Sequence, residues 1–234
     1  MSAAELPPAN VLVPFERVAV LVRQLTHDVR NGFNALELQS AYVAELLRDP
    51  EDHSDAASEL KRLRGMIAEN TNSLRRFSAR FRVSPPSLVE YPAQMFTEDF
   101  RARLAKTLPD FAPQVAWTRD LADEVIPLDF EMVSAALGEI FQNAAHFQER
   151  GEPVTAHASA TAGRFQIALR EHHAALPSAP ATWGREPFVS TRPGGHGLGI
   201  FHARRLLAAH GGGVEFTHDA ASAQLTTRVF LPLA

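Results

Sequence analysis

The sequence contains no cysteine in its 234 residues. This absence excludes disulfide bonds, thiolate zinc sites and catalysis by a cysteine nucleophile. No apolar run approaches the roughly 20 residues that a membrane-spanning helix needs. Residues 1–10 also lack the basic-then-apolar order of a signal peptide. We therefore expect a soluble, cytoplasmic protein that does not contact a membrane.

The sequence also lacks a strong excess of charge of either sign. Its 23 basic and 27 acidic residues give a net charge of -4, and the pI is near 6.2. Composition therefore gives no reason to expect nucleic acid or an anionic membrane surface as a partner. With 45% hydrophobic residues, the chain is long enough for one large or two modest domains with real cores.

Residues 15–82 have the apolar spacing of two long helices. The first is expected over about 15–47, where apolar residues recur every three or four positions. After Asp49-Pro50, the second helix carries a heptad-like seam, which consists of Leu60, Leu63, Ile67, Asn70, Leu74, Phe77 and Phe81. Two antiparallel helices cannot bury both stripes alone. We therefore predict a homodimer through residues 15–82 that forms a four-helix bundle, in which Asn70 fixes the register. The alternative is a hairpin that packs on the C-terminal domain of its own chain.

The run Ser84-Pro85-Pro86-Ser87 marks a domain boundary. Before the helices, residues 1–14 are predicted to form an arm, and residues 83–234 have a mixed α/β pattern. Thr97 and Asp129 are each predicted to cap a helix, the second of which covers residues 130–147. Strands are predicted at 87–91, 115–118, 125–128, 154–160, 164–170, 214–217 and 225–231, with a hairpin turn at Ala162-Gly163.

Glycines gather in the stretch 186–213, EPFVSTRPGGHGLGIFHARRLLAAHGGG. The second half of this stretch has the apolar spacing of a helix, which the last three glycines end. Glycines ahead of a helix let the backbone approach a ligand, and the N–H groups of the first turn favour an anion such as phosphate. The alternative explanation is a tight turn followed by a helix stop.

The order of EPF, G-x-G-L-G and HGG in this stretch resembles the C-terminal half of the ATP-binding domain of sensor histidine kinases, which has the GHKL ATPase fold. The resemblance implies that ATP and Mg²⁺ bind here. It implies phosphate-binding contacts from Thr191, Arg192, Gly195, Gly197, Leu198 and Gly199. The helix 130–147 resembles the N-box of the same family. By this resemblance, Asn143 would ligate the Mg²⁺ that bridges the ATP phosphates, and Glu139 would act as a general base. An ordinary polar helix face is the alternative for these two residues.

His27 and Asp28 form a second candidate site on the first helix. Leu25 and Val29 belong to the buried stripe, and His27 is two residues from each, which is about 200° around the helix. His27 should therefore point away from the seam, where a neighbouring carboxylate can polarise its imidazole. The alternative is a surface His-Asp pair on a solvated helix face.

The string Leu25 to Gly32, LTHDVRNG, resembles the H-box of histidine kinases. His27 falls on the phosphorylated histidine, Asp28 on the adjacent acid and Arg30 on the arginine. Asn31 falls on the residue that positions water for dephosphorylation of a partner regulator. Gly32 replaces the usual proline, which bears on whether the helix bends there. The two resemblances imply an all-α dimeric helical hairpin followed by an α/β (α+β) GHKL-like sandwich.

One motif of the family is altered. Where the family has D-x-G-x-G, whose aspartate binds the adenine amino group, this chain has Glu171, His173 and Ala175 in the three positions. Side chains in place of glycine would crowd the base, and the longer carboxylate would displace the hydrogen bond. A metal site at His172-His173 is disfavoured, since adjacent residues of a strand project to opposite faces.

Three functions are consistent with these features. The first is a histidine-kinase-like core that phosphorylates His27 from ATP and passes the phosphoryl group to a response-regulator aspartate. Its sensor would be a separate, upstream protein. The second is a histidine phosphotransferase that relays phosphate between receiver domains and whose GHKL-like domain no longer binds ATP. The third is a non-enzymatic scaffold or inhibitor of a kinase.

Overall fold

The computed structural model describes residues 13–47, 53–80, 84–149, 151–176, 179–192 and 195–234. The chain divides into two compact units, one over Val13–Arg82 and one that includes Val83–Ala234. Residues 1–12 of the predicted arm lie outside the described residues, as do the predicted helix break at Asp49-Pro50 and the last seam residue, Phe81. No helix in the described ranges has both the length and the apolarity that a membrane crossing requires.

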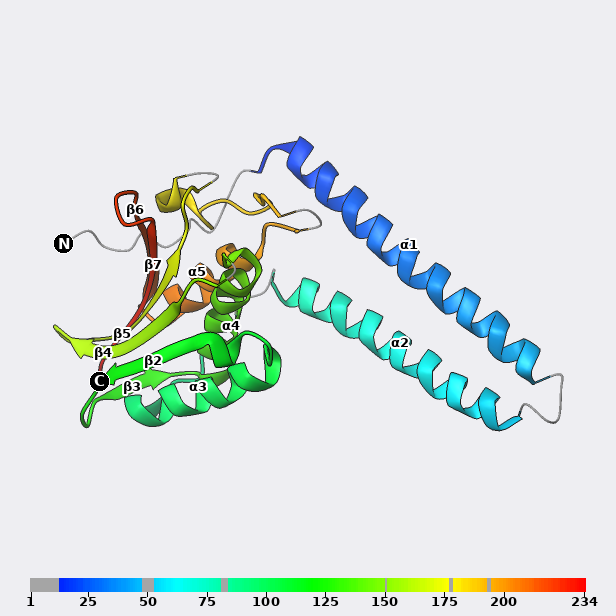
Figure 1. The fold of residues 1–234 in the computed structure, drawn as a ribbon, viewed down its shortest axis with the longest axis horizontal. Helices are drawn as coiled ribbons and strands as arrows, with labels where there is room; N and C mark the ends of the chain where they lie inside the picture. The colour runs from blue at the N-terminus through cyan, green and yellow to red at the C-terminus, as the bar shows by residue number, and fades with distance from the viewer. Residues whose placement is uncertain (1–12, 48–52, 81–83, 150, 177–178, 193–194) are drawn as a thin grey trace. The chain divides into compact units, whose positions relative to one another are not determined.

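The first unit is a hairpin of two long helices, α1 (Phe15–Leu46) and α2 (His53–Ala79) (Figure 1). Helix α1 begins directly after Pro14, whose backbone is extended at φ -55° and ψ 134°. The helices are joined by a hydrogen bond of 2.5 Å from Gln39 Nε2 to Glu59 Oε2. Helix α1 continues through Gly32 without interruption.

The hairpin leaves much of its apolar surface uncovered within one chain. Among the described side chains of the hairpin, the buried hydrophobic ones are Leu21, Val43 and Ala56. In contrast, the predicted seam of α2 stays open, with Leu60, Ile67 and Leu74 exposed by 40%, 48% and 42%. A stripe of this kind costs free energy in water unless another surface covers it.

The second unit is an α/β sandwich, which confirms the predicted fold class. Its elements are β1 (Val89–Pro92), α3 (Ala93–Thr107), η2 (Ala112–Gln114), β2 (Val115–Asp120), β3 (Val125–Leu128), α4 (Phe130–Phe147), β4 (Val154–Thr161), β5 (Arg164–His172), η3 (Pro180–Thr182), α5 (Gly199–Ala209), β6 (Gly213–Asp219) and β7 (Gln224–Pro232).

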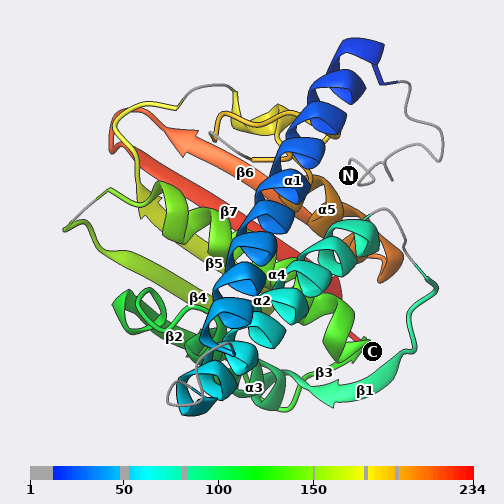
Figure 2. The same ribbon diagram turned by 90° about the vertical axis from the view of Figure 1, so that its right-hand side faces the viewer.

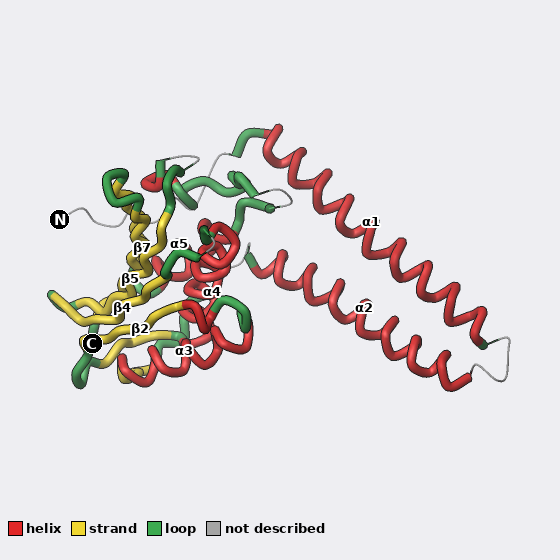
Figure 3. Tube along the Cα trace, viewed as in Figure 1, coloured by secondary structure: helices red, strands yellow, loops and turns green. Residues whose placement is uncertain are grey.

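The main sheet has the strand order β2-β4-β5-β7-β6, and β1 pairs with β3 in a small separate sheet. Strands β2 and β4 are parallel, while the other neighbours in the main sheet are antiparallel. The helices α3, α4 and α5 form a layer against one face of this sheet (Figures 2 and 3). The core lies between the two layers and contains Phe96, Phe100, Phe141 and Phe165, each at most 1% exposed.

The predicted turns and helix starts have different outcomes. Ala162 and Gly163 form the β4–β5 turn with positive φ of 51° and 73°, as the two-residue hairpin requires. Asp129 caps α4 as predicted, because its carboxylate accepts from the Met132 N–H at 3.1 Å. The cap predicted at Thr97 is wrong. The N-cap of α3 is Pro92, five residues earlier, and the Thr97 hydroxyl is buried and donates to the Ala93 carbonyl at 2.8 Å.

Candidate phosphotransfer and nucleotide sites

Helix α1 presents His27 to solvent, with its side chain 72% exposed. Leu25 and Val29, on either side in sequence, are half-buried, so the apolar stripe faces inward and the imidazole faces outward. The His27 Nδ1 atom lies 3.5 Å from Asp28 Oδ1. A carboxylate on the Nδ1 side favours a proton on that nitrogen and leaves Nε2 with its lone pair.

Asn31 lies one turn further along α1, beside the same imidazole. Its Nδ2 atom is 3.2 Å from Nδ1 and 3.4 Å from Nε2 of His27. The amide nitrogen is therefore within hydrogen-bonding distance of both ring nitrogens. The imidazole as a whole stays accessible, and an amide donor is present beside any group that becomes attached to the ring.

Asn70 of α2 packs against α1 at Gly32, one turn beyond His27. A Cβ atom added to Gly32 would lie 2.8 Å from Asn70 Oδ1 and 2.9 Å from Asn70 Nδ2. The polar interruption of the predicted seam therefore faces the glycine that replaces the usual proline of the H-box. The small residue makes room for the amide at this level of the hairpin.

In the second unit, α4 brings Glu139 next to the start of α5. Glu139 and Asn143 are both half-buried and lie one turn apart on the same face of the helix. A Cβ atom on Gly199, the first residue of α5, would lie 2.7 Å from Glu139 Oε2. A glycine at this position therefore lets the N-terminus of α5 lie close to the glutamate, in the region where the resemblance places phosphates.

The glycine-rich loop is fixed by its own backbone contacts. Gly197 has a positive φ of 63°, its carbonyl accepts from the Phe188 N–H at 2.9 Å, and an added Cβ would collide with the Val189 backbone. A Cβ on Gly195 would lie 2.5 Å from Ser190 Oγ. Leu198 is 1% exposed and anchors the loop in the core. The predicted ligands Thr191 and Arg192 are exposed, while Pro193 and Gly194 lie outside the described residues.

His210, the histidine of the HGG motif, joins α5 to α4. Its Nε2 accepts from the Asp129 N–H at 3.1 Å, and its Nδ1 donates to the Leu206 carbonyl at 2.8 Å. This pattern requires a neutral ring with the proton on Nδ1. Burial alone would raise the pKa of Asp129, but hydrogen bonds from the Met132 and Ser87 N–H groups outweigh it and lower that pKa below its usual value.

The segment that leads from β5 to α5 is attached to the sheet by Arg204 of α5. Its Nε donates to the Trp183 carbonyl at 2.6 Å and its Nη1 to the Val214 carbonyl at 2.9 Å. The Trp183 ring packs on Phe216 with the ring centroids 5.5 Å apart. The described part of this segment is therefore held against β6.

The altered motif lies at the end of β5, where alternate residues face the core. Leu169, Glu171 and His173 are all buried, whereas Arg170 is exposed and His172 half-buried, as the two-residue period of a strand predicts. Glu171 Oε1 and His173 Nε2 form an ion pair at 3.5 Å. The Glu171 carboxylate raises the pKa of His173, although burial acts in the opposite direction.

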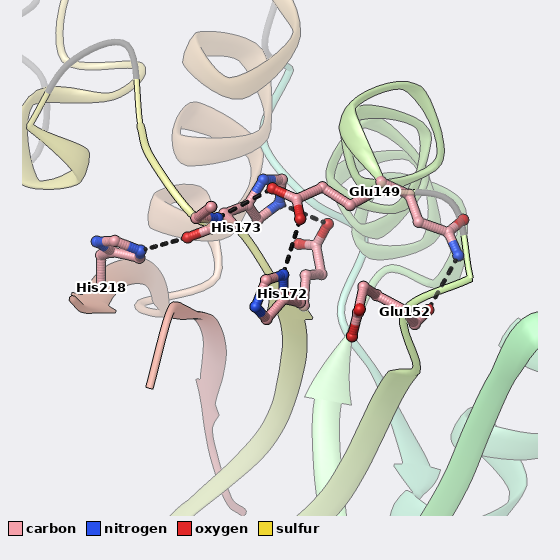
Figure 4. A network of polar contacts seen from close by, with 8 residues as sticks. Glu149, Glu152, His172, His173 and His218 are labelled. Carbon is pink, nitrogen blue, oxygen red and sulfur yellow. Dashed lines mark hydrogen bonds and ion pairs between the residues drawn. The ribbon is translucent and has the colours of Figure 1, made fainter. Parts of the chain in front are cut away.

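Two residues without any motif signal in the sequence, Glu149 and His218, hold this strand end in place (Figure 4). Glu149 accepts from His172 Nδ1 at 2.8 Å and from the Ala174 N–H at 2.9 Å. His218 donates from Nε2 to the His173 carbonyl at 2.9 Å. Among the residues that the structure describes, no three His, Asp or Glu side chains are grouped so that they could hold a metal ion.

Together, the hairpin with its exposed histidine and the α/β unit with its glycine-rich loop define a protein with the architecture of a histidine kinase catalytic core. The chain is 27% identical over 233 residues to the sensory histidine kinase/phosphatase NtrB of Salmonella typhimurium, with 91% of this chain and 62% of the relative covered. It thus spans about three fifths of the length of that curated relative. No protein-family model matches the chain.

Solved structures support the same fold. Full-length ShkA in complex with AMPPNP aligns over 95% of this chain and 46% of its own, with a TM-score of 0.59 and 21% identity. The histidine kinase ThkA in complex with the response regulator TrrA aligns over 93% of this chain and 63% of its own, with a TM-score of 0.55 and 15% identity. The resemblance to the catalytic core of sensor histidine kinases is confirmed.

The two groups of residues that the resemblance assigns to a nucleotide differ in how well their chemistry suits ATP. We call Asn143, Gly195, Gly197 and Gly199 the phosphate end, since an amide oxygen and closely packed glycine backbone suit a magnesium-bound polyphosphate. We call Glu171, His173 and Ala175 the base end, and the chemistry of these residues does not suit adenine. The carboxylate that would bind the amino group is 5% exposed, and it is already paired with a histidine of the same chain.

Proposed function

We propose that this is a two-component signalling protein in which His27 carries a phosphoryl group and exchanges it with the aspartate of a response-regulator receiver domain. The observation that carries the proposal is the exposed His27 ring with Asp28 at its Nδ1 atom and Asn31 one turn away. The likeness to kinases of the NtrB type supports it. So does the solved complex of the structurally similar ThkA with its response regulator.

The transfer needs a nucleophile, a place for one proton and an accessible phosphorus atom. Nε2 of His27 attacks the phosphorus of the donor, so a P–N bond forms as the P–O bond to the donor oxygen breaks. The proton on Nδ1 is held by the Asp28 carboxylate, which offsets the positive charge that develops on the ring. In the reverse step the receiver carboxylate attacks, the P–N bond breaks and the neutral imidazole is restored. Asn31 would orient water for dephosphorylation of the regulator.

We further propose that residues 15–82 form a homodimer. The exposed seam of α2 supports this, because Leu60, Ile67 and Leu74 remain 40–48% exposed and a second copy would supply a matching stripe. Each His27 would then lie on the outer surface of a four-helix bundle, accessible to a receiver domain.

The source of the phosphoryl group distinguishes two candidate functions. Autophosphorylation from ATP with Mg²⁺ is supported by the phosphate end, where Asn143 and the glycine-rich loop are retained. A histidine phosphotransferase that takes its phosphate from another receiver is favoured by the buried Glu171–His173 pair at the base end. A scaffold without chemistry at His27 remains a third candidate, which the experiment below separates from the other two.

The first test is whether His27 carries phosphate at all. We expect phosphoramidate, a small chemical phosphoryl donor, to phosphorylate the purified chain at His27 and the label to pass to a receiver domain from the same genome. The His27→Gln variant should lose transfer by more than about a hundredfold, because no other nucleophile occupies that position. Mass spectrometry of the modified peptide and loss of label from the protein measure the two steps.

His157→Gln is the matched control, since His157 is a half-buried histidine on β4 of the α/β unit, bonded to Thr118, and does not belong to the helix that carries His27. Transfer that survives in His27→Gln, or that is lost equally in both variants, would contradict the proposal. Incubation of the same preparation with ATP and Mg²⁺ then shows whether nucleotide can replace the chemical donor.

A further inference from the structure

We propose that His173, paired with Glu171, closes the base end of the nucleotide site against purine nucleotides, so that His27 receives its phosphoryl group from a phosphorylated receiver domain. This inference rests on the proposed phosphotransfer function and names its donor. It also assigns a specificity role to residues 171, 173 and 175.

The first step of the argument is the direction of the side chains. Leu169 belongs to the core cluster between the sheet and the helices. Glu171 and His173 continue the same row of β5, so their side chains point into the helix layer and away from solvent. His173 is 7% exposed. The imidazole therefore occupies space on the inner side of the strand end, where a glycine would leave room for a planar base.

The second step is the state of the carboxylate. The Glu171 Oε1 and His173 Nε2 atoms are buried and have no hydrogen-bond partner in the part of the chain that the structure describes. They are each other's ion-pair partner at 3.5 Å. A carboxylate can select an adenine only if it can face the exocyclic amino group of that base, and here the imidazole takes the place of that donor. Entry of a base would separate two buried groups that then lack partners.

The third step is that the backbone around His173 is held from two sides (Figure 4). On one side, the His173 N–H donates to the Ala223 carbonyl at 2.7 Å, and the His173 carbonyl accepts from His218. On the other side, Glu149 at the end of α4 binds both His172 and the Ala174 N–H. Because neighbouring residues are anchored in both directions, an outward movement of the strand end to make room for a ligand would break these hydrogen bonds.

The phosphate end supplies an internal comparison. Gly195, Gly197 and Gly199 all lie where an added Cβ would collide with a neighbouring group, so the close approach of backbone segments is kept there. At the base end, by contrast, His173 and Ala175 carry side chains where the family's D-x-G-x-G motif has glycines. We therefore expect substitutions at that end to restore the fit to a base.

The decisive experiment restores the base end. The triple variant Glu171→Asp, His173→Gly, Ala175→Gly of the full chain is compared with the unmodified chain by calorimetry, with a non-hydrolysable ATP analogue and Mg²⁺. We expect no binding by the unmodified chain up to millimolar nucleotide and at least about tenfold tighter binding by the variant. Tripolyphosphate with Mg²⁺, which has no base, should have the same affinity for both proteins. Adding Asn143→Ala to the variant should abolish the gain.

Two results would overturn the inference. One is equal affinity of both proteins for the nucleotide, which would mean that the Glu171–His173 pair opens or serves as an adenine site. The other is no binding by either protein, which would mean that other residues exclude the base. The single variant His173→Ala, which removes only the ring, covers the case in which the triple variant does not fold, and should bind more tightly than the unmodified chain.

Failure here and failure of the proposed function are distinguishable. Phosphoryl exchange between a receiver domain and His27 is measured without nucleotide, so it can succeed while the nucleotide result contradicts the closed base end. If the closed base end is correct, a phosphorylated receiver should label His27 and radioactive ATP should not. Labelling of the unmodified chain by ATP would contradict the inference and leave phosphotransfer at His27 intact.

Discussion

At the scale of single residues, glycine is needed at different positions for different physical reasons. Gly151 and Gly197 both have positive φ, at 85° and 63°. An added Cβ would have open space around Gly151, but at Gly197 it would meet the backbone of Phe188 and Val189. At Gly151, glycine is favoured only by the positive φ. At Gly197, it is favoured by the positive φ and also by the close contact of two segments of the glycine-rich loop.

We expect Gly197→Ala to destabilise the α/β unit more than Gly151→Ala does. A left-handed backbone costs a residue with a Cβ about 1–2 kcal/mol, which should be the whole effect at Gly151. At Gly197 the collision adds to this cost and displaces the loop. Denaturant unfolding followed by tryptophan fluorescence measures the difference, since both tryptophans, Trp117 and Trp183, belong to this unit. Equal losses in the two variants would show that the contact is unimportant.

The sequence could predict the geometry of groups that are close together along the chain. His27, Asp28 and Asn31 lie on one helix, and their relative positions follow from its pitch, while their proposed roles stay predictions. The Glu171–His173 pair was visible only as a departure from a motif, because its burial depends on the helices that cover β5. Glu149 and His218 were not predicted at all. Each contacts the strand end from a distant part of the chain, and nothing in the local sequence indicates such a contact.

At the scale of elements, the start of α4 depends on groups from three parts of the chain. The Asp129 carboxylate caps the helix through Met132 and also accepts from the Ser87 N–H at 3.1 Å. The Asp129 N–H is bound by His210 at the end of α5. The cap was predictable because aspartate before an apolar helix is a local signal. Thr97 gave the same kind of signal, but the cap predicted there was wrong. Pro92 and the hydrogen bond from the Ala93 N–H to the Glu124 carbonyl set the start of α3 instead.

Asp129 should make the stability of the α/β unit depend on pH in the acid range. Its folded-state pKa lies below its usual value, so the charged form stabilises the fold above the unfolded-state pKa of about 3.9. That stabilisation is lost as the pH falls through the folded-state pKa. Asp129→Ala should cost about 1 kcal/mol of unfolding free energy at neutral pH. Unfolding monitored by tryptophan fluorescence over a range of pH tests this.

Asp129→Asn is the control for charge, because asparagine can still cap the helix but cannot ionise. The difference in unfolding free energy between the unmodified chain and this variant should shrink on acidification below about pH 4. A difference that stays constant with pH would mean that the cap acts through its hydrogen bonds alone.

At the scale of the whole molecule, the two units differ in how much of their apolar surface they bury. The α/β unit buries a continuous core of aromatic and aliphatic side chains. The hairpin buries few side chains and leaves the α2 seam open. The heptad spacing predicted this seam from the sequence, but a periodic stripe does not identify the surface that covers it. The proposed second copy is therefore a matter for experiment.

Ile67→Lys should weaken or abolish the proposed dimer. Ile67 is 48% exposed in the single chain and lies at the centre of the seam, so a second copy would have to bury the introduced ammonium group without a partner. We expect a shift from dimer to monomer in sedimentation at micromolar concentration. Glu69→Lys introduces the same side chain about 200° around the helix and should stay dimeric. Monomeric behaviour of the unmodified chain would contradict the proposed assembly.

The bridging histidine between α4 and α5 gives the molecule a built-in spectroscopic probe. His210 is 5% exposed, and its Nδ1 proton is donated to the Leu206 carbonyl. The exchange of this proton with water should therefore be slow. In proton NMR such a ring proton is resolved well downfield of the backbone amides. Its signal would persist while the two helices stay docked and disappear when they separate. The proton is therefore a reporter, requiring no label, of local opening where the end of α5 meets the start of α4.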